Sequence, residues 1–266
     1  MSSAASDLAP VAVLPLLTTR RLGRDYALLS ACGSTNDEVA ARARAGAGAG
    51  LVIAAEMQTG GRGRRGHTWH SPAGANLYCS LLLRPALPAS GVPPLTLLAG
   101  AALAQSLGTL GLSPRLKWPN DVLLDTLAGW RKVAGILTEM GCEGERVRHV
   151  IVGLGVNANS RDFPDFLART ATSLCLVGGA AVDRGVLLAG FLNAFEPLYD
   201  AFLASGPAAG LGEWRRHAVL GQPCWVSRGD ARIEGVASDV DSTGALLVCT
   251  PAGATVTVHA GEVNWL

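Results

Sequence analysis

The stretch Gln58-Thr-Gly-Gly-Arg-Gly-Arg-Arg-Gly66 is the most unusual part of this 266-residue chain, and it lies between two expected strands. Its closely spaced glycines allow the backbone to approach a ligand and to adopt positive φ angles. Arg62, Arg64 and Arg65 supply planar donors that suit carboxylate and phosphate groups. The spacing matches neither a phosphate-binding G-K-[ST] loop nor a dinucleotide-binding GxGxxG turn. The stretch therefore predicts a loop that becomes ordered around an anion, or else a solvated basic loop or a nucleic-acid patch.

Two further segments place positive charge beside turns. Lys117-Trp-Pro-Asn-Asp121 combines a cation, an amide and a carboxylate, so Asp121 could bind Mg²⁺ while Lys117 meets phosphate oxygens. The same Pro-Asn-Asp sequence also suits an ordinary turn. Lys132 begins an apolar strand, where its ammonium could neutralise a carboxylate and a phosphate together, or could simply protect a strand edge. Because these two residues are the only lysines among 22 basic residues, their closeness in sequence favours a chemical role.

Three smaller features add candidate residues, and each has a plain structural alternative. Ser34-Thr35-Asn36 can cap a helix or hydrogen-bond to a polar ligand. Trp69, just after the arginine-rich loop, can stack on a base or pack in the core. Asn157, which ends the sequence Gly153-Leu-Gly-Val-Asn157, is either a turn residue or a contact to a nucleotide and a metal ion.

The order of the expected elements indicates an α+β fold with a second, smaller β unit. Residues 1–24 are rich in Ala, Ser and Pro and are expected to be a loosely ordered lead-in. Residues 25–219 are expected to form a catalytic domain with a mixed β-sheet flanked by helices. Its expected strands are 26–31, 51–56, 76–83, 116–124, 132–140 and 147–156, and its expected helices are 34–45, 95–112, 185–204 and 214–220. Residues 220–266 contain short alternating runs at 225–227, 233–237, 246–249 and 255–258, which predict a small β-barrel.

Composition excludes several classes of protein. A net charge of +1 and 49% hydrophobic residues exclude a disordered chain and disfavour a globally basic nucleic-acid binder. The charge is uneven: residues 220–266 hold two arginines against five acidic residues, a net charge of −3, so the rest carries +4. The uncharged run between Arg84 and Arg115 contains polar residues and glycines, so we expect a core helix rather than a membrane span. Six cysteines without a CxxC pair, and no signal-peptide pattern, predict a reduced, cytoplasmic protein.

Taken together and in order, the motifs resemble those of the biotin protein ligases. They are S-T-N at 34–36, Q-x-x-G-R-G-R-R-G at 58–66, W-x-S-P-x-G-A-N-L-Y at 69–78, K-W-P-N-D at 117–121, R-K-x-A-G-I-L at 131–137 and G-x-G-x-N at 153–157. The resemblance covers about residues 26–159, and the C-terminal β unit is similar to the SH3-like domain of that family. It implies that biotin and ATP, with Mg²⁺, form biotinyl-5′-AMP and pyrophosphate. A lysine of a biotin carboxyl carrier domain, of the acetyl-CoA carboxylase type, then receives the biotinyl group.

The resemblance also assigns roles to individual residues. The implied catalytic residues are Arg62, Arg64 and Lys132. The implied biotin contacts are Ser34, Thr35, Asn36, Gln58, Arg62, Gly63, Arg64 and Lys132. The implied ATP contacts are Trp69, Lys117, Asn120, Asp121 and Asn157, with Asp121 also a ligand of Mg²⁺.

The resemblance leaves two alternatives and makes further predictions about partners. One alternative is a lipoate or octanoate ligase or transferase of the same fold, against which the arginine-rich loop and the K-W-P-N-D segment argue. The other is a biotin-responsive transcriptional repressor. Bifunctional family members carry an N-terminal winged helix-turn-helix, and residues 1–25 are too few for such a domain, so we expect no specific DNA binding. No membrane partner is expected, and a homodimer is compatible with the sequence.

Overall fold

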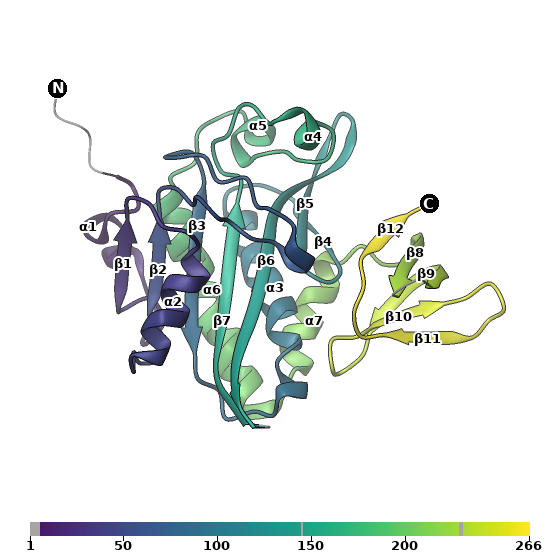
Figure 1. Ribbon diagram of the computed structural model, residues 1–266. Coiled ribbons are helices and arrows are strands. Elements are labelled where there is room, and N and C mark those ends of the chain that lie inside the picture. The colour runs from purple at the N-terminus through teal and green to yellow at the C-terminus, as the bar shows by residue number, and fades with distance from the viewer. Residues whose placement is uncertain (1–5, 145, 229–230) are drawn as a thin grey trace.

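A seven-stranded mixed sheet forms the centre of the larger domain (Figure 1), and the expected α+β fold is confirmed. The computed structural model describes residues 6–144, 146–228 and 231–266. The strand order is β1-β2-β3-β7-β6-β5-β4, in which β1 and β2 are parallel and the other neighbours are antiparallel. The strands are β1 (Tyr26–Leu29), β2 (Val52–Ala55), β3 (Leu77–Leu83), β4 (Arg115–Lys117), β5 (Asp121–Thr126), β6 (Gly129–Glu143) and β7 (Arg146–Val156).

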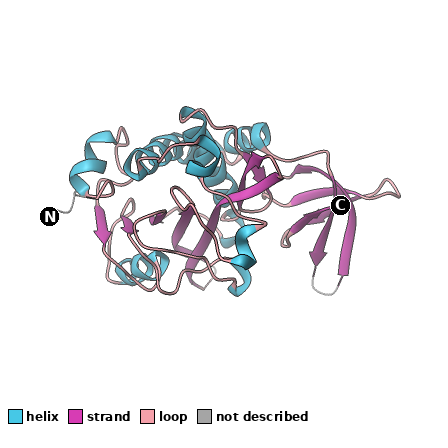
Figure 2. Cartoon of the chain, turned by 90° about the horizontal axis from the view of Figure 1, so that it is seen from above, coloured by secondary structure: helices cyan, strands magenta, loops and turns pink. Residues whose placement is uncertain are grey.

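Helices cover the two faces of this sheet unequally. α3 (Pro94–Thr109), α6 (Arg184–Ser205) and α7 (Ala208–His217) pack together on one face, and α2 (Thr35–Arg44) lies on the other (Figures 1 and 2). α3 is the expected core helix and is buried along most of its length because it is apolar on all sides. α6 is long and apolar enough to cross a membrane by length and composition, but half of its apolar window is buried inside the fold, as in a core helix. The shorter helical pieces are α1 (Pro10–Val13), η1 (Leu14–Leu16), η2 (Arg64–Gly66), η3 (Ala89–Gly91), α4 (Asp165–Ala168) and α5 (Leu174–Gly178).

The sheet face that carries α2 changes character along β7. Beneath the helix lies a small apolar cluster whose buried members are Val39, Ala43, Leu51, Ile53, Leu82 and Ile151. Further along β7 on the same face come Gly153 and Gly155, because alternate residues of a strand share a face. A Cβ at Gly153 would collide with Asn36, and one at Gly155 would lie 2.6 Å from the indole of Trp69. Glycine at these two positions therefore lets the Asn36 side chain and the Trp69 indole approach the backbone of β7.

The segment before β1 belongs to the core, so the expectation of a loosely ordered lead-in was wrong for residues 6–24. Leu8 and Val13 are fully buried. Arg184, at the start of α6, donates hydrogen bonds to Asp7 (Nε to Oδ1, 2.9 Å) and to Glu56 (Nη1 to Oε2, 2.7 Å). The Arg184 side chain is only 7% exposed. A buried ion-pair network therefore ties this segment to α6 and to the end of β2.

One expected strand is in fact two. Residues 116–124 were expected to be continuous, but the chain turns at Trp118–Asn120 and forms the antiparallel hairpin of β4 and β5. The turn places Lys117 and Asp121 opposite each other in the strand register. The interpretation of Pro-Asn-Asp as turn material was therefore correct, and it brings two candidate site residues together.

The C-terminal unit is an antiparallel sheet with the order β11-β10-β9-β8-β12, and it projects to one side of the larger domain (Figure 2). Its strands are β8 (Pro223–Arg228), β9 (Ala231–Val240), β10 (Leu246–Cys249), β11 (Thr255–Val258) and β12 (Val263–Trp265). The four expected runs lie in β8 to β11, whereas β12 was not expected. In the described residues β11 and β12 are the unpaired edges, so the SH3-like unit is an open sheet rather than the closed barrel that was expected. The Trp118 indole donates to Gly244 O (2.9 Å) and joins the two domains.

Candidate active site

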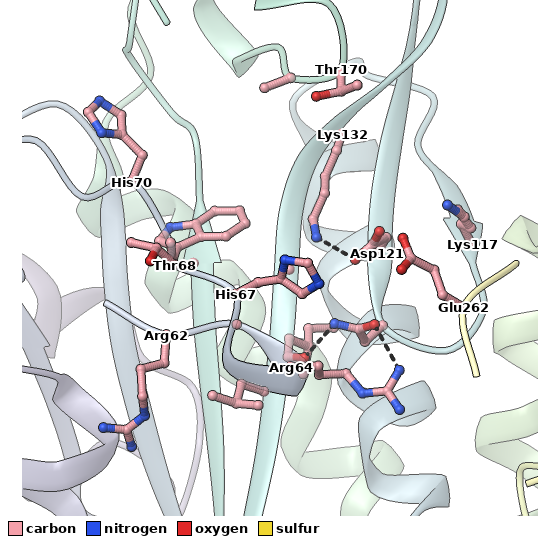
Figure 3. Close-up of a pocket in the computed structure, with 18 of the residues that line it drawn as sticks. Arg62, Arg64, His67, Thr68, His70, Lys117, Asp121, Lys132, Thr170 and Glu262 are labelled. Carbon is pink, nitrogen blue, oxygen red and sulfur yellow. Dashed lines mark hydrogen bonds and ion pairs between the residues drawn. The ribbon is translucent and has the colours of Figure 1, made fainter. Parts of the chain in front are cut away.

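A cavity of about 570 Å³ lies above the glycine-containing part of the sheet, between the arginine-rich loop and the strands β5 to β7 (Figure 3). Its volume is typical of small-molecule sites. The structure brings all the candidate residues to its walls: Ser34, Thr35, Asn36, Gln58, Arg62, Gly63, Arg64, Trp69, Lys117, Asn120, Asp121, Lys132 and Asn157. The separate motifs therefore meet at a single site, while the role of each residue stays a prediction.

Lys132 and Asp121 form an ion pair inside the cavity (Figure 3). The two charged atoms, Lys132 Nζ and Asp121 Oδ1, are 2.6 Å apart, and Nζ lies 5.4 Å from the ring centre of Trp69. The backbone of Lys132 is fixed on both sides, because its N–H donates to Thr170 O (2.8 Å) and its carbonyl accepts from Thr172 N (2.9 Å). The ammonium is thus held at the cavity wall, where an incoming anion can replace Asp121 as its partner.

Arg62 is turned toward α2 rather than toward Lys132 (Figure 3). Its guanidinium makes a bidentate contact with Asp37 at 2.5 and 2.8 Å, and Nη2 lies 3.5 Å from Glu139 Oε1. The hydrogen bonds from Arg62 hold the pKa of the Asp37 carboxyl below its usual value. This arginine therefore anchors the loop to the helix in the present conformation.

Arg64 lines the cavity and, unlike Arg62, forms no ion pair with a described residue. Its Nη1 lies 3.4 Å from both Asn120 Oδ1 and Gly261 O, which are long contacts. Burial is the main reason why the pKa of Arg64 is lowered from its usual value. The turn that aims it depends on Arg65, the only described non-glycine residue with positive φ (54°). Arg64 is thus a weakly held cation that a ligand anion can recruit.

The start of α2 supplies a buried polar wall. The Thr35 N–H donates to Gln58 Oε1 (2.9 Å), and Ser80 Oγ lies 2.6 Å from Asn36 Oδ1. Ser34 occupies the N-cap position, but its side chain makes no capping hydrogen bond, so the capping alternative is wrong for this residue. The hydroxyl that would have capped the helix is instead on the cavity wall.

The residues expected to contact ATP differ in how firmly the protein holds them. Lys117 on β4 forms no ion pair with any described residue, so its charge is available to phosphate. Asn120 is fixed in the turn because its Nδ2 donates to Ile136 O (3.0 Å). Asn157 is 6% exposed and donates through Nδ2 to Thr172 O (3.1 Å). Asn157 therefore also holds the segment that backs Lys132.

The C-terminal sheet completes the cavity, which the sequence did not reveal. The residues of the C-terminal unit that line the cavity are Gly261, Glu262, Asn264 and Trp265. The ring of Trp265 stands edge-on to that of Trp130, with centroids 6.4 Å apart and planes at 70°. Further lining residues that were not predicted are Gly135, Phe163, Leu167, Arg169 and Thr170. A glycine inside a strand, as at Gly135, was the one available signal, because it marks a close approach by another group.

Comparisons with known proteins agree with this geometry. A family model described as the biotin/lipoate A/B protein ligase family matches residues 34–157, and one described as the biotin protein ligase C-terminal domain matches residues 219–264. The chain is 37% identical to the biotin–[acetyl-CoA-carboxylase] ligase of Paracoccus denitrificans, over 89% of this chain and 98% of that one. It is 35% identical to the protein of the same name from Mycobacterium tuberculosis, over 90% of this chain and 88% of that one.

Comparison with solved structures supports the same family. The biotin protein ligase from Aquifex aeolicus, solved in complex with biotin and ATP, matches with a TM-score of 0.77 and 26% identity over 91% of this chain and 98% of that one. The sequence motifs, their meeting at one cavity and these matches agree, and the resemblance is confirmed. The chain belongs to the biotin protein ligase family.

Proposed function

We propose that this protein joins biotin to ATP to give biotinyl-5′-AMP and then transfers the biotinyl group to a lysine of a biotin carboxyl carrier domain of the acetyl-CoA carboxylase type. The observation that carries the proposal is the Lys132–Asp121 pair in a cavity that Arg64 also enters. Two similar proteins are named biotin–[acetyl-CoA-carboxylase] ligase, which supports the choice of carrier. The six cysteines are free, which supports a cytoplasmic location.

In the first step a carboxylate oxygen of biotin bonds to the α-phosphorus of ATP. The bond from that phosphorus to the bridging oxygen breaks, and pyrophosphate leaves with the electron pair. Two anions must approach each other, so positive charge fixed in advance lowers the barrier. Lys132 supplies that charge at the point where the two groups meet, and Arg64 supplies it from the loop.

In the second step the uncharged lysine amine of the carrier attacks the biotinyl carbonyl. The bond from that carbon to the phosphate oxygen breaks, AMP leaves, and the amine loses a proton. The substrate amine is itself the nucleophile, so none is needed from the enzyme. The mixed anhydride must be kept from water meanwhile, and residues from the 58–71 segment and the C-terminal sheet, which line the cavity, would cover it.

The cavity suits a Mg²⁺ ion that arrives with ATP. In the described residues no group of three His, Cys, Asp or Glu side chains could hold a metal ion alone. Mg²⁺ in nucleotide sites usually takes one or two carboxylates and completes its shell with phosphates and water. Asp121 offers such a carboxylate once Lys132 turns to the substrate, and the ion would neutralise phosphate charge. Absence of specific DNA binding remains a prediction, and a homodimer remains compatible with the sequence.

The function is tested by incubating the protein with ATP, Mg²⁺, biotin and a purified carrier domain, followed by intact-mass measurement. The expected result is a mass gain of one biotinyl group, with none on a carrier whose target lysine is replaced by arginine. Parallel samples contain lipoate or octanoate instead of biotin. Modification by either of these acids in preference to biotin would overturn the proposal.

Arg64→Gly is expected to let biotinyl-5′-AMP escape roughly tenfold faster or more, since one charge-assisted hydrogen bond contributes about 1.5–3 kcal/mol. The reason is that Arg64 lines the cavity and has only long contacts to protein, so its hydrogen-bonding capacity is available to the ligand. Dissociation of the preformed intermediate is measured by rapid filtration. Arg161→Gly, which changes an exposed arginine outside the cavity, is the control. An unchanged dissociation rate would remove Arg64 from the retention of the intermediate.

A further inference from the structure

A chain of hydrogen bonds runs from β6 to the start of α2 at the buried wall of the cavity. Asn36 Nδ2 donates to Glu139 Oε2 (2.6 Å) and to Leu137 O (3.3 Å). Asn36 Oδ1 lies 2.6 Å from Ser80 Oγ, and Ser80 Oγ lies 2.7 Å from Thr35 Oγ1. Thr35, Asn36 and Ser80 are all buried, so bulk water does not complete their hydrogen bonds.

Two hydroxyl protons serve three oxygen–oxygen contacts here, so we assign them to the two shortest, Ser80 with Asn36 and Ser80 with Thr35, and leave the 3.2 Å contact of Thr35 with Gln58 without a proton. A carboxylate and a backbone carbonyl accept hydrogen bonds and cannot donate them, so both hold the amide nitrogen of Asn36 toward β6. The amide oxygen then faces Ser80, whose single proton must go to it. The 2.7 Å contact between Ser80 and Thr35 therefore uses the Thr35 proton. The Thr35 hydroxyl is left with its lone pairs as acceptors.

The neighbouring groups extend this acceptor surface. Gln58 Oε1 lies 3.2 Å from Thr35 Oγ1 and accepts the Thr35 backbone N–H. Because the Thr35 hydroxyl donates its proton to Ser80, Thr35 Oγ1 and Gln58 Oε1 can both accept hydrogen bonds from a ligand. The Ser34 hydroxyl has no hydrogen-bond partner in the described part of the chain and can donate. This array suits a ring that offers N–H groups beside a carbonyl oxygen, as a cyclic urea does, and it does not suit a dithiolane.

We propose that Glu139 is a positioning residue that determines which groups of this cavity wall donate hydrogen bonds and which accept them. It orders the protons of Asn36, Ser80 and Thr35 so that Thr35 accepts from a ureido N–H of the ligand. The inference rests on the proposed function, because it assigns the ureido ring of biotin to this wall. A carboxylate accepts from both of its neighbours, Asn36 Nδ2 and the Arg62 Nη2 at 3.5 Å. A glutamine would turn its own N–H₂ toward one of them.

The test compares Glu139→Gln with Glu139→Asp, which keeps a carboxylate, and with Glu143→Gln. Glu143 is a matched control on the same strand, where it pairs with the exposed Arg148. Binding of biotin, and of biotin methylated on a ureido nitrogen, is measured by calorimetry on the full chain without ATP. We expect Glu139→Gln to weaken biotin binding roughly tenfold, the effect of one buried hydrogen bond, and Glu139→Asp to recover part of it. Glu143→Gln should match the wild type.

Methylated biotin distinguishes the loss of one hydrogen-bond acceptor from a general loss of biotin binding. Methylation removes an N–H and should weaken binding to the wild type strongly, but it should weaken binding to Glu139→Gln much less, because the acceptor for that N–H is already lost. Equal effects of methylation on both proteins would overturn the role of Glu139, even if the variant binds biotin poorly. A wild type that binds no biotin would instead overturn the proposed function. If Glu139→Gln fails to fold, Ser80→Ala, which frees the Thr35 proton, must show the same reduced effect of methylation.

Discussion

Replacing Lys132 by alanine is expected to slow adenylate formation by about 10²- to 10³-fold, the usual effect of removing one preorganised charge from a reacting centre. The ammonium lies in the cavity with Asp121 as its only described ion-pair partner, at 2.6 Å, and its backbone is fixed by two hydrogen bonds. No other lysine in the chain is placed to replace it, because Lys117 lies on β4 at the far side of Asp121. Biotin-dependent pyrophosphate release from ATP in a single turnover measures the effect.

The fold of this variant should persist. The Asp121 side chain is 16% exposed and can recruit water after its partner is removed, so the melting temperature should change little. Arg146→Ala removes a cation at the exposed start of β7, outside the cavity, and should keep the normal rate. Near-normal pyrophosphate release by Lys132→Ala would refute the role assigned to this lysine.

Replacing Arg184 by alanine should lower the free energy of unfolding by about 3–5 kcal/mol, as when one partner of a buried ion pair is removed. The reason is that Asp7 and Glu56 would keep their charges in a partly buried place without the guanidinium that now binds both. Urea denaturation followed by circular dichroism gives the change. Arg20→Ala, which breaks an exposed pair with Asp200, is the matched control and should cost about 1 kcal/mol or less. A similar loss for both variants would show that the network does not fasten the N-terminal segment.

The cost of losing Arg184 should also depend on pH. Burial alone would raise the pKa of Asp7, but the hydrogen bonds and charge of Arg184 outweigh it and hold the pKa below the usual 3.8. A carboxyl whose pKa is lowered by folding adds stability above its unfolded pKa, and this stability is lost as the pH falls through the folded value. The difference between wild type and variant should therefore be full at neutral pH and shrink below about pH 4. Urea titrations in both ranges measure it, and a constant difference would contradict the linkage.

Elements with a local signal could be predicted from the sequence. Residues 185–204 repeat their apolar side chains at helical spacing and form α6, Arg184–Ser205, and the runs 246–249 and 255–258 coincide with β10 and β11. The packing of residues 6–24 could not be predicted, because it depends on Asp7 meeting a residue 177 positions away. β12 was missed for the same reason, since its partner is the distant β8.

The site was predictable in its members but not in their directions. The side chains that the motifs singled out do line one cavity, while their roles stay predictions. No local pattern says that Arg62 turns to Asp37 while Arg64 enters the cavity, because that choice depends on which carboxylate lies within reach in three dimensions. Trp265 was missed because it comes from another domain and meets Trp130 only after the two domains pack.

Gly153 and Gly155 let Asn36 and the Trp69 indole lie directly on the backbone of β7, and both glycines line the cavity, so a bound ligand would extend this packing over the rest of the sheet face. A ligand that binds only the folded state raises stability by about 2.7 kcal/mol at roughly one hundred times its Kd. The melting temperature should therefore report occupancy of the cavity, and inhibitors can be ranked by thermal shift without a carrier protein. Variants must be compared after bound biotin has been removed, because retained biotin would hide a loss of stability.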